Sequence, residues 1–469
     1  MLSNRFLGKL EMTGGNGSKD YLLAQIRGGG TLSGGQQLKL CLMLSYPAII
    51  AQVSSVLMQY IDTSMVGHLG AAAGASIGLV STCMWLLMGF CGACGSGFSV
   101  QVAHLIGAND FKTAREVLRQ ALVSALCFSG AIAVLGMAIA GPLPRWLGGT
   151  PEIIPDATKY FFIVSAFLPF MQLDWICASM LQVSGNMKVP SYLNIGMCLM
   201  DVCFNYLFIY VLDLGVVGAA LGTGLAELIT AMAMLYFLTV RSPELNLRQD
   251  KGSFKPTGKV IAKAAGIGGP MALQNVLIRG GYIASTVIVA PLGTIAIAAN
   301  SFAITAESFC YMPGYGIADA ATALVGQSVG AGRKELAKRF AWITIGLGMG
   351  IMGLLAILMY AFAPEMMQML SPDGEVISLG ARVLRIEAFA ELGYAASIVA
   401  YGVCVGAGDT KWPSVMNFTS MWIVRILPAI FLVKVYGLVG FWIAMAVELT
   451  FRGAIFLVRI ARGKWLEAA

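Results

Sequence analysis

The heptapeptide GNMKVPS at residues 185–191 returns as GDTKWPS at residues 408–414, which is an offset of 223 residues. Further matches keep the same offset: Pro47 with Pro270, Leu69-Gly70 with Leu292-Gly293, and Ile106-Gly107-Ala108 with Val329-Gly330-Ala331. A fixed period in several separate motifs is the signature of internal duplication. The chain is therefore predicted to contain two copies of one unit.

Each copy contains apolar stretches long enough to cross about 30 Å of hydrocarbon. They lie near residues 40–66, 75–105, 114–140, 157–184, 190–211 and 216–240, then 260–290, 295–328, 338–363, 378–406, 413–435 and 438–460. Composition agrees, because 58% of residues are hydrophobic and 12% charged, against about 25% charged in soluble domains. We predict an all-α membrane protein of twelve transmembrane helices in two six-helix lobes. Since six is even, a pseudo-two-fold axis along the membrane normal should relate the lobes.

Polar segments mark the ends and the middle of this pattern. The predicted organisation is a polar N-terminal tail (1–39), an N-lobe (40–240), a linker (241–258), a C-lobe (259–462) and a C-terminal tail (463–469). Lys and Arg gather in the tails, the linker and the loops of one side, which predicts that both termini are cytoplasmic. The net charge of +7 is scattered rather than gathered on one basic face, so nucleic acid is not an expected partner.

Two local patterns suggest chemistry that the rest of the chain does not support. LSGGQ at residues 32–36 spells the signature of ATP-binding-cassette proteins, but no Gly-Lys pair is followed by the Ser or Thr of a phosphate-binding loop. Cys91 and Cys94 have metal-pair spacing without a second pair, and the chain has only two His. We therefore expect no enzyme, no metal centre and no cofactor, and we interpret LSGGQ as coincidence in a flexible tail.

Polar residues inside the first lobe are the main candidates for function. Asp62 lies late in the first apolar helix, where an acid costs roughly 2.5 to 3.5 kcal/mol on insertion scales and needs a compensating role. It can bind and release a proton, or coordinate sodium as an anion; the alternative is a residue at the outer interface. Asp201 and Asn205 share one helical face, and Tyr160 and Thr223 can add hydroxyls. Each of these also suits an ordinary interhelical hydrogen bond.

The second lobe offers a possible polar site of its own. Its candidates are Arg279, Glu307, Asp319 and Asp409, with Arg425 and Glu448 as further charges inside apolar spans. Charges of this kind can satisfy one another by pairing across the lobe, without transport chemistry. Asp409 lies in a Gly-Asp-Thr-Lys context, which is as typical of a cytoplasmic turn as of a polar site.

Several motifs together resemble the multidrug and toxic compound extrusion (MATE) family over residues 40–460. They are YIDTSMVGHLG at residues 60–70, GVVGAA at 215–220, VGQSVGAGR at 325–333 and GAGDTK at 406–411. The resemblance implies two lobes in a V around a central cavity, which alternates between the two faces of the membrane. It also implies exchange of substrate for protons or sodium, with the N-lobe cation network at Asp62, Tyr160, Asp201, Asn205 and Thr223.

Two departures from the family pattern concern the coupling ion. Many members that resemble this chain have Asn and then Asp four residues later, whereas this sequence has Asp201 and then Asn205. Another branch carries a Glu in the seventh helix, where this sequence has Ile278-Arg279. The order of the pair leaves proton and sodium both open, and the acidic site of the other branch is expected to be absent.

The expected function is a cation-coupled antiporter that exports drugs and other toxic organic compounds, often cationic. We expect a monomer in a cytoplasmic membrane, with H+ or Na+ as the coupling ion and sodium, if used, at Asp62. A flippase for lipid-linked precursors is an alternative, although it should have a more cationic cavity and extra helices. A non-transporting membrane scaffold is a second alternative, but it would need neither the repeat nor Asp62.

Overall fold

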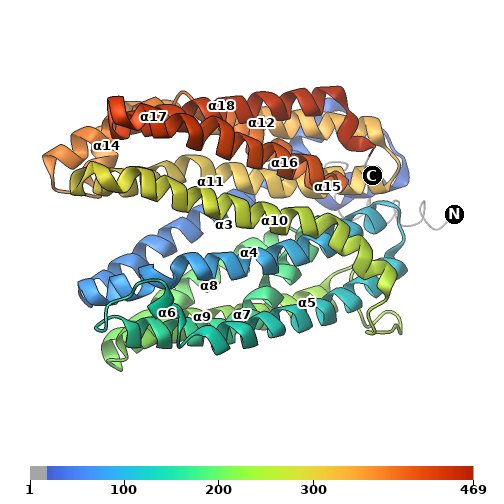
Figure 1. Ribbon diagram of the computed structural model, residues 1–469. Coiled ribbons are helices and arrows are strands. Elements are labelled where there is room, and N and C mark those ends of the chain that lie inside the picture. The colour runs from blue at the N-terminus through green and yellow to red at the C-terminus, as the bar shows by residue number, and fades with distance from the viewer. Residues whose placement is uncertain (1–17, 468–469) are drawn as a thin grey trace. The chain divides into compact units, whose positions relative to one another are not determined.

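The computed structural model describes residues 18–467, which form helices joined by short turns and contain no strand (Figure 1). Within residues 18–467, eleven helices are long and apolar enough to cross a membrane, and a bent helix pair makes twelve if it counts as one span. The predicted helical membrane fold is therefore confirmed.

The spans follow the predicted order. In the first half they are α3 (Gly34–Gly67), α4 (Ala71–Gly107), α5 (Phe111–Ile139), α7 (Ile154–Val183), α8 (Lys188–Tyr206) with the π-helix η1 (Leu207–Val211), and α9 (Gly215–Tyr236) with η2 (Phe237–Arg241). In the second half they are α10 (Gly258–Val289) with η3 (Ala290–Leu292), α11 (Thr294–Gly330), α12 (Lys334–Ala361), the bent pair α14 (Gly374–Glu387) and α15 (Glu391–Ala407), α16 (Lys411–Thr419) with η4 (Ser420–Ile426) and α17 (Leu427–Tyr436), and α18 (Leu438–Arg462). Shorter elements are α2 (Lys19–Gly28), α6 (Leu143–Trp146), α13 (Ala363–Gln368) and η5 (Lys464–Leu466).

The internal repeat extends to backbone conformation. Helices α4 and α11 both contain 37 residues and lie at the repeat offset. Gly70 precedes α4 with φ +110°, and Gly293 precedes α11 with φ +94°. Residues with a Cβ rarely adopt such angles, so glycine is needed at both places. The two copies thus share the same sharp entry into their second helix.

The chain divides into two compact units. We call Ser54–Asn275 the N-terminal unit, and the chain up to Val53 together with Val276 onward the C-terminal unit. The predicted lobes divide in polar segments, whereas these units divide within α3 and α10. The start of α3 thus belongs to the C-terminal unit, and the start of α10 belongs to the N-terminal unit. Glycines allow these two helix segments to pack closely within their units. In the N-terminal unit a Cβ on Gly97 would lie 2.2 Å from the Ala264 carbonyl oxygen, and in the C-terminal unit a Cβ on Gly316 would lie 2.7 Å from the Ile49 nitrogen.

Each unit has its own apolar core. In the N-terminal unit α4, α5, α7 and α9 contribute buried side chains, among them Val102, Leu118 and Ile176. In the C-terminal unit α11, α14 and α18 contribute Ala303, Leu384 and Trp442. The core helices of the N-terminal unit also carry Tyr160, Asp174, Thr223 and Glu227, and those of the C-terminal unit carry Glu307, Glu387 and Glu448.

The prediction of a flexible tail before residue 40 is wrong for residues 18–39. This segment contains α2 and the start of α3. Ser18 caps α2 by accepting a hydrogen bond from the Tyr21 amide at 3.4 Å. Leu22, Leu23 and Ile26 are buried, and Arg333 donates to the Gln25 carbonyl at 3.0 Å. Burial of one apolar face thus holds α2 on the C-terminal unit. Residues 1–17 of the tail lie outside the described residues.

The LSGGQ pentapeptide forms the start of the first membrane helix. The Ser33 amide donates to Gln36 Oε1 at 2.9 Å, and the Gln36 amide donates to Ser33 Oγ at 3.3 Å. This reciprocal arrangement is a capping box, which satisfies amide groups that have no partner within the helix. The pentapeptide therefore has a structural role in this chain.

We expect Ser33→Ala to destabilise this helix start by about 1 kcal/mol and to leave ATP hydrolysis at background. Thermal unfolding in detergent measures the first effect and a phosphate-release assay the second. Ser33→Asp is the matched control, because an Asp side chain also caps a helix. ATP hydrolysis that is present in the wild type and lost in Ser33→Ala would contradict the structural role.

Candidate functional site

Asn205 bridges two acidic side chains in the N-terminal unit. Its amide nitrogen donates to Asp62 Oδ1 at 3.0 Å and to Asp201 Oδ2 at 3.1 Å. Asp62 comes from α3, whereas Asp201 and Asn205 lie on one face of α8. The amide thus holds together two carboxyl groups that would repel one another as anions.

Hydroxyl groups from two further helices surround this bridge. Thr223, on α9, is a hydrogen-bonding neighbour of Asp201. Tyr160, on α7, lies within electrostatic range of both Asp62 and Asp201. The structure therefore brings together all five residues that the sequence suggested for the N-lobe network. Their role in coupling stays a prediction.

A glycine sets the approach of α9 to this site. A Cβ on Gly222 would lie 2.1 Å from Asn205 Oδ1 and 3.0 Å from the Asn205 backbone nitrogen. Any larger residue would push the bridging amide out of place. The sequence analysis did not identify Gly222, because a glycine in an apolar helix carries no distinct pattern.

Two oxygens of the site have no hydrogen-bond donor within the described part of the chain. Asp201 Oδ1 and Asn205 Oδ1 are buried and accept no hydrogen bond from the described residues. Buried polar atoms without partners are costly, so such oxygens favour a bound proton or cation. The part of the chain that the structure describes contains no group of three His, Cys, Asp or Glu side chains able to hold a metal ion. Two carboxyls and one amide instead suit a proton or a monovalent cation.

Two more acids of the N-terminal unit were missed by the sequence analysis. Glu227 on α9 lies within electrostatic range of Asp201 and of Asp174, which lies on α7. Both are ionisable residues in apolar spans, which is the same signal that identified Asp62. The acidic region of this unit is therefore larger than predicted.

In the C-terminal unit the central polar feature is Glu448 on α18. Its carboxylate accepts hydrogen bonds from Arg425 at 2.6 Å, from Arg452 at 2.7 Å and from the Ser420 hydroxyl. Glu307 lies within electrostatic range of Arg425. The predicted pairing of charges across this lobe is thus present between Arg425 and Glu448.

Two buried acids beside this network were missed. Glu387 ends α14 and Glu391 begins α15, at the break where the two helices bend by 60°. Both are fully buried, and apart from the weakly donating Cys310 thiol beside Glu391, no donor among the described residues reaches their oxygens. The sequence signal that could have identified them is the presence of two ionisable side chains in an apolar span.

The other candidates of the C-lobe do not form one site. Asp319 is a neighbour of Gln52, and Arg279 stacks over Tyr282 with 5.8 Å between the guanidinium carbon and the ring centroid. Asp409 accepts a hydrogen bond from Arg459 Nε at 2.7 Å. The expected C-lobe polar site is therefore divided among separate local contacts.

The linker is held by a cluster outside the membrane spans. Arg115 Nε donates to Asp250 Oδ2 and Arg119 Nη2 donates to Asp250 Oδ1, both at 2.6 Å. The hydrogen bond from Arg119, followed by that from Arg115, lowers the pKa of Asp250 below its usual range. The linker thus docks on α5 as an ordered part of the N-terminal unit.

Comparison with known proteins decides the family. The family model MatE matches residues 47–207 and again 270–431. The chain belongs to the MATE family. Members of this family are transporters, so the chain is a transporter and not an enzyme. The second match begins at Pro270 and the first at Pro47, which is the offset of the internal repeat.

Curated MATE relatives cover nearly the whole chain. The probable multidrug resistance protein NorM of Thermotoga maritima is 26% identical over 439 residues, which are 91% of this chain and 92% of that protein. The multidrug resistance protein MdtK of Yersinia enterocolitica is 26% identical over 442 residues, 91% of this chain and 95% of that protein.

A solved MATE structure has the same fold. A mutant of the Vibrio cholerae MATE transporter VcmN superposes with a TM-score of 0.84 at 18% identity, and covers 92% of this chain and 97% of its own. MATE transporter structures have twelve helices in two lobes. The comparison supports the predicted helix architecture.

Proposed function

We propose that this MATE transporter exports amphipathic, often cationic, organic compounds in exchange for protons or sodium ions. The observation that carries the proposal is the Asn205 amide between Asp62 and Asp201, beside two buried oxygens that accept no hydrogen bond from residues 18–467. A proton or monovalent cation bound there would offset negative charge in an apolar environment, where uncompensated charge is costly. Cation binding can therefore bias the conformation of the N-terminal unit.

Asp62 and Asp201 can change the relative stability of two conformations because they lie on different helices. Asp62 lies on α3 and Asp201 on α8, so repulsion between their carboxylates acts between two helices. A bound cation relieves the repulsion and favours the state in which the carboxyls are close. A ligand shifts a conformational equilibrium only by its difference in affinity for the two states. Substrate must therefore favour the state that the cation disfavours, which is antiport by alternating access.

The proposed substrates follow from the relatives and from composition. Two relatives are named multidrug resistance proteins. The chain has 26 Met, 23 Phe and 8 Trp, and flexible thioethers and aromatic rings suit recognition of varied apolar compounds. Such side chains would select substrates loosely by their shape. A few polar groups would then orient the bound substrate.

We also propose that the protein acts as a monomer in the cytoplasmic membrane, with both termini in the cytoplasm. Lys and Arg of the tails and of the linker would then lie on the positively charged side of the membrane. A cysteine-labelling experiment at Ser253 of the linker tests the orientation, because a membrane-impermeant reagent should reach it only in everted vesicles.

Everted vesicles with separately imposed proton and sodium gradients test the coupling. We expect uptake of a fluorescent cationic dye to require one of the two gradients and to stop when that gradient is collapsed. Vesicles without the protein supply the background. Dye uptake that ignores both gradients would exclude antiport.

A further inference from the structure

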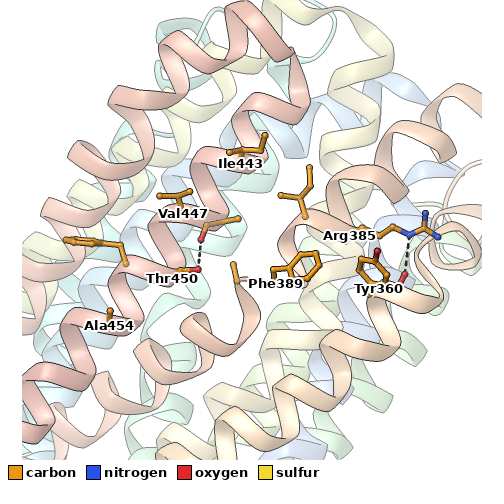
Figure 2. A pocket seen from close by; sticks show the side chains of 11 residues that line it. Tyr360, Arg385, Phe389, Ile443, Val447, Thr450 and Ala454 are labelled. Atoms are coloured by element: carbon orange, nitrogen blue, oxygen red, sulfur yellow. Dashed lines mark hydrogen bonds between the residues drawn. The ribbon is translucent and has the colours of Figure 1, made fainter.

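A long groove lies in the C-terminal unit, with a volume of about 740 Å³. Figure 2 shows Ile443, Val447, Thr450 and Ala454 in a row along α18, with Phe389 and Tyr360 across from them. Phe389 belongs to the break between α14 and α15, and it is 76% exposed. The helix break thus turns a large aromatic side chain outward, where it forms one wall of the groove.

The length and the apolar lining of the groove suit the acyl chain of a lipid. The row from Ile443 to Ala454 spans roughly 16 Å at the rise of an α-helix, which is close to half of the ~30 Å hydrocarbon core. Its lining is apolar except for Thr450, Tyr360 and Arg385. The Thr450 hydroxyl donates to the Ala446 carbonyl of its own helix at 2.9 Å. Nothing along the row therefore requires a polar partner.

Positive charge lies on the side of the groove opposite α18, beyond Phe389 (Figure 2). Arg385 donates to the Tyr360 carbonyl at 3.3 Å and lies over the Tyr360 ring, with 5.6 Å to its centroid. Tyr360 is next to the last residue of α12, so this side of the groove lies at a helix end. Arg382, one turn earlier on α14, lines a second depression of about 400 Å³ that also contains Arg385.

We propose that this groove binds an anionic phospholipid, with one acyl chain along α18 and the phosphate at Arg385 and Arg382. A guanidinium is well suited to phosphate, because its planar donors match the phosphate oxygens. Among the described residues Arg385 donates from Nε to the Tyr360 carbonyl, so its other N–H groups can turn to a headgroup, and Arg382 is exposed in the neighbouring depression. Both can reach a headgroup from the side of the groove.

Charge distinguishes this occupant from the proposed transport substrates. Cationic drugs would be repelled by two arginines, and the described lining of the groove contains no acid. A zwitterionic lipid fills the same apolar row but gains less from the arginines, because its own cation opposes them. The headgroup charge is therefore the property that the test varies.

Native mass spectrometry of the purified full-length protein measures the binding. Phosphatidylglycerol and phosphatidylcholine with identical acyl chains are titrated separately, and glycerol phosphate is offered as a competitor without chains. We expect the anionic lipid to bind more tightly, and Arg382→Gln with Arg385→Gln to weaken it about tenfold while weakening phosphatidylcholine distinctly less. Glycerol phosphate should not displace the lipid.

Two further variants complete the test. Ala454→Trp fills the groove without a change in charge and should weaken both lipids, whereas Arg145→Gln removes an exposed arginine of the N-terminal unit and should weaken neither. Equal binding of the two lipids by the wild type, undiminished binding of phosphatidylglycerol by the double variant, or full displacement by glycerol phosphate would each overturn the proposal.

Discussion

Asp62→Asn is expected to abolish cation-driven efflux while the protein still inserts and folds. The amide keeps the shape of the side chain and can still accept the hydrogen bond that Asn205 donates to Asp62 Oδ1. It removes the charge that a proton or sodium ion would neutralise, so cation binding no longer distinguishes two conformations. Dye uptake in everted vesicles should fall to the level of vesicles without the protein.

Asp213→Asn is the matched control for this substitution. Asp213 is an exposed acid of the same unit with φ 51°, and Asn tolerates that left-handed backbone conformation well. Its efflux should match the wild type, and gel filtration in detergent should show both variants as folded. Undiminished drug resistance with Asp62→Asn would remove Asp62 from the coupling site.

Substitutions at positions 201 and 205 are expected to have the second large effect on coupled efflux. Asp201→Asn leaves Asp62 as the one acid in contact with Asn205, and it replaces a carboxylate that accepts from Asn205 at 3.1 Å. The site loses half of its charge and a charge-assisted hydrogen bond, which is worth about 1.5 to 3 kcal/mol. We expect cation affinity to fall by about tenfold or more and coupled efflux to weaken accordingly.

Adding Asn205→Asp restores one carboxyl and one amide in reversed order. The amide at position 201 can then donate to the carboxyl at 205, while the 205 carboxyl meets Asp62 directly. Two acids in contact require a shared proton or a bound cation, so at least partial efflux should return with a stronger dependence on the cation. The measurement is efflux of the wild type, single and double variants across a cation titration. A single variant equal to the wild type would make Asp201 a structural residue, and a double variant no better than the single would show that the positions are not interchangeable.

Helix positions were predictable because membrane spans are read from length and hydropathy alone. The predicted stretch 190–211 and the observed Lys188–Val211 agree within a few residues. The N-lobe residues were predictable for a related reason, since an Asp inside an apolar helix is rare and costly. Asp201 and Asn205 then followed from helical spacing.

Contacts between distant segments could not be read in this way. The tail helix α2 depends on Arg333, which lies more than 300 residues later. Asp409 and Arg459 pair across 50 residues, whereas the Gly-Asp-Thr-Lys context of Asp409 left a polar site and a cytoplasmic turn equally open. Glycine 222 matters only because α9 approaches Asn205, and such proximity has no local signature.

The bent pair of α14 and α15 also has a consequence for biosynthesis. Glu387 and Glu391 stand in a single span, and an ionisable residue at the centre of a lone helix costs roughly 2.5 to 3.5 kcal/mol on insertion scales. Arg425 of η4, which lies within electrostatic range of Glu387, is translated only afterwards. The tenth span therefore gains this cationic partner only after the eleventh span has been made, and we expect these two spans to reach their final packing together.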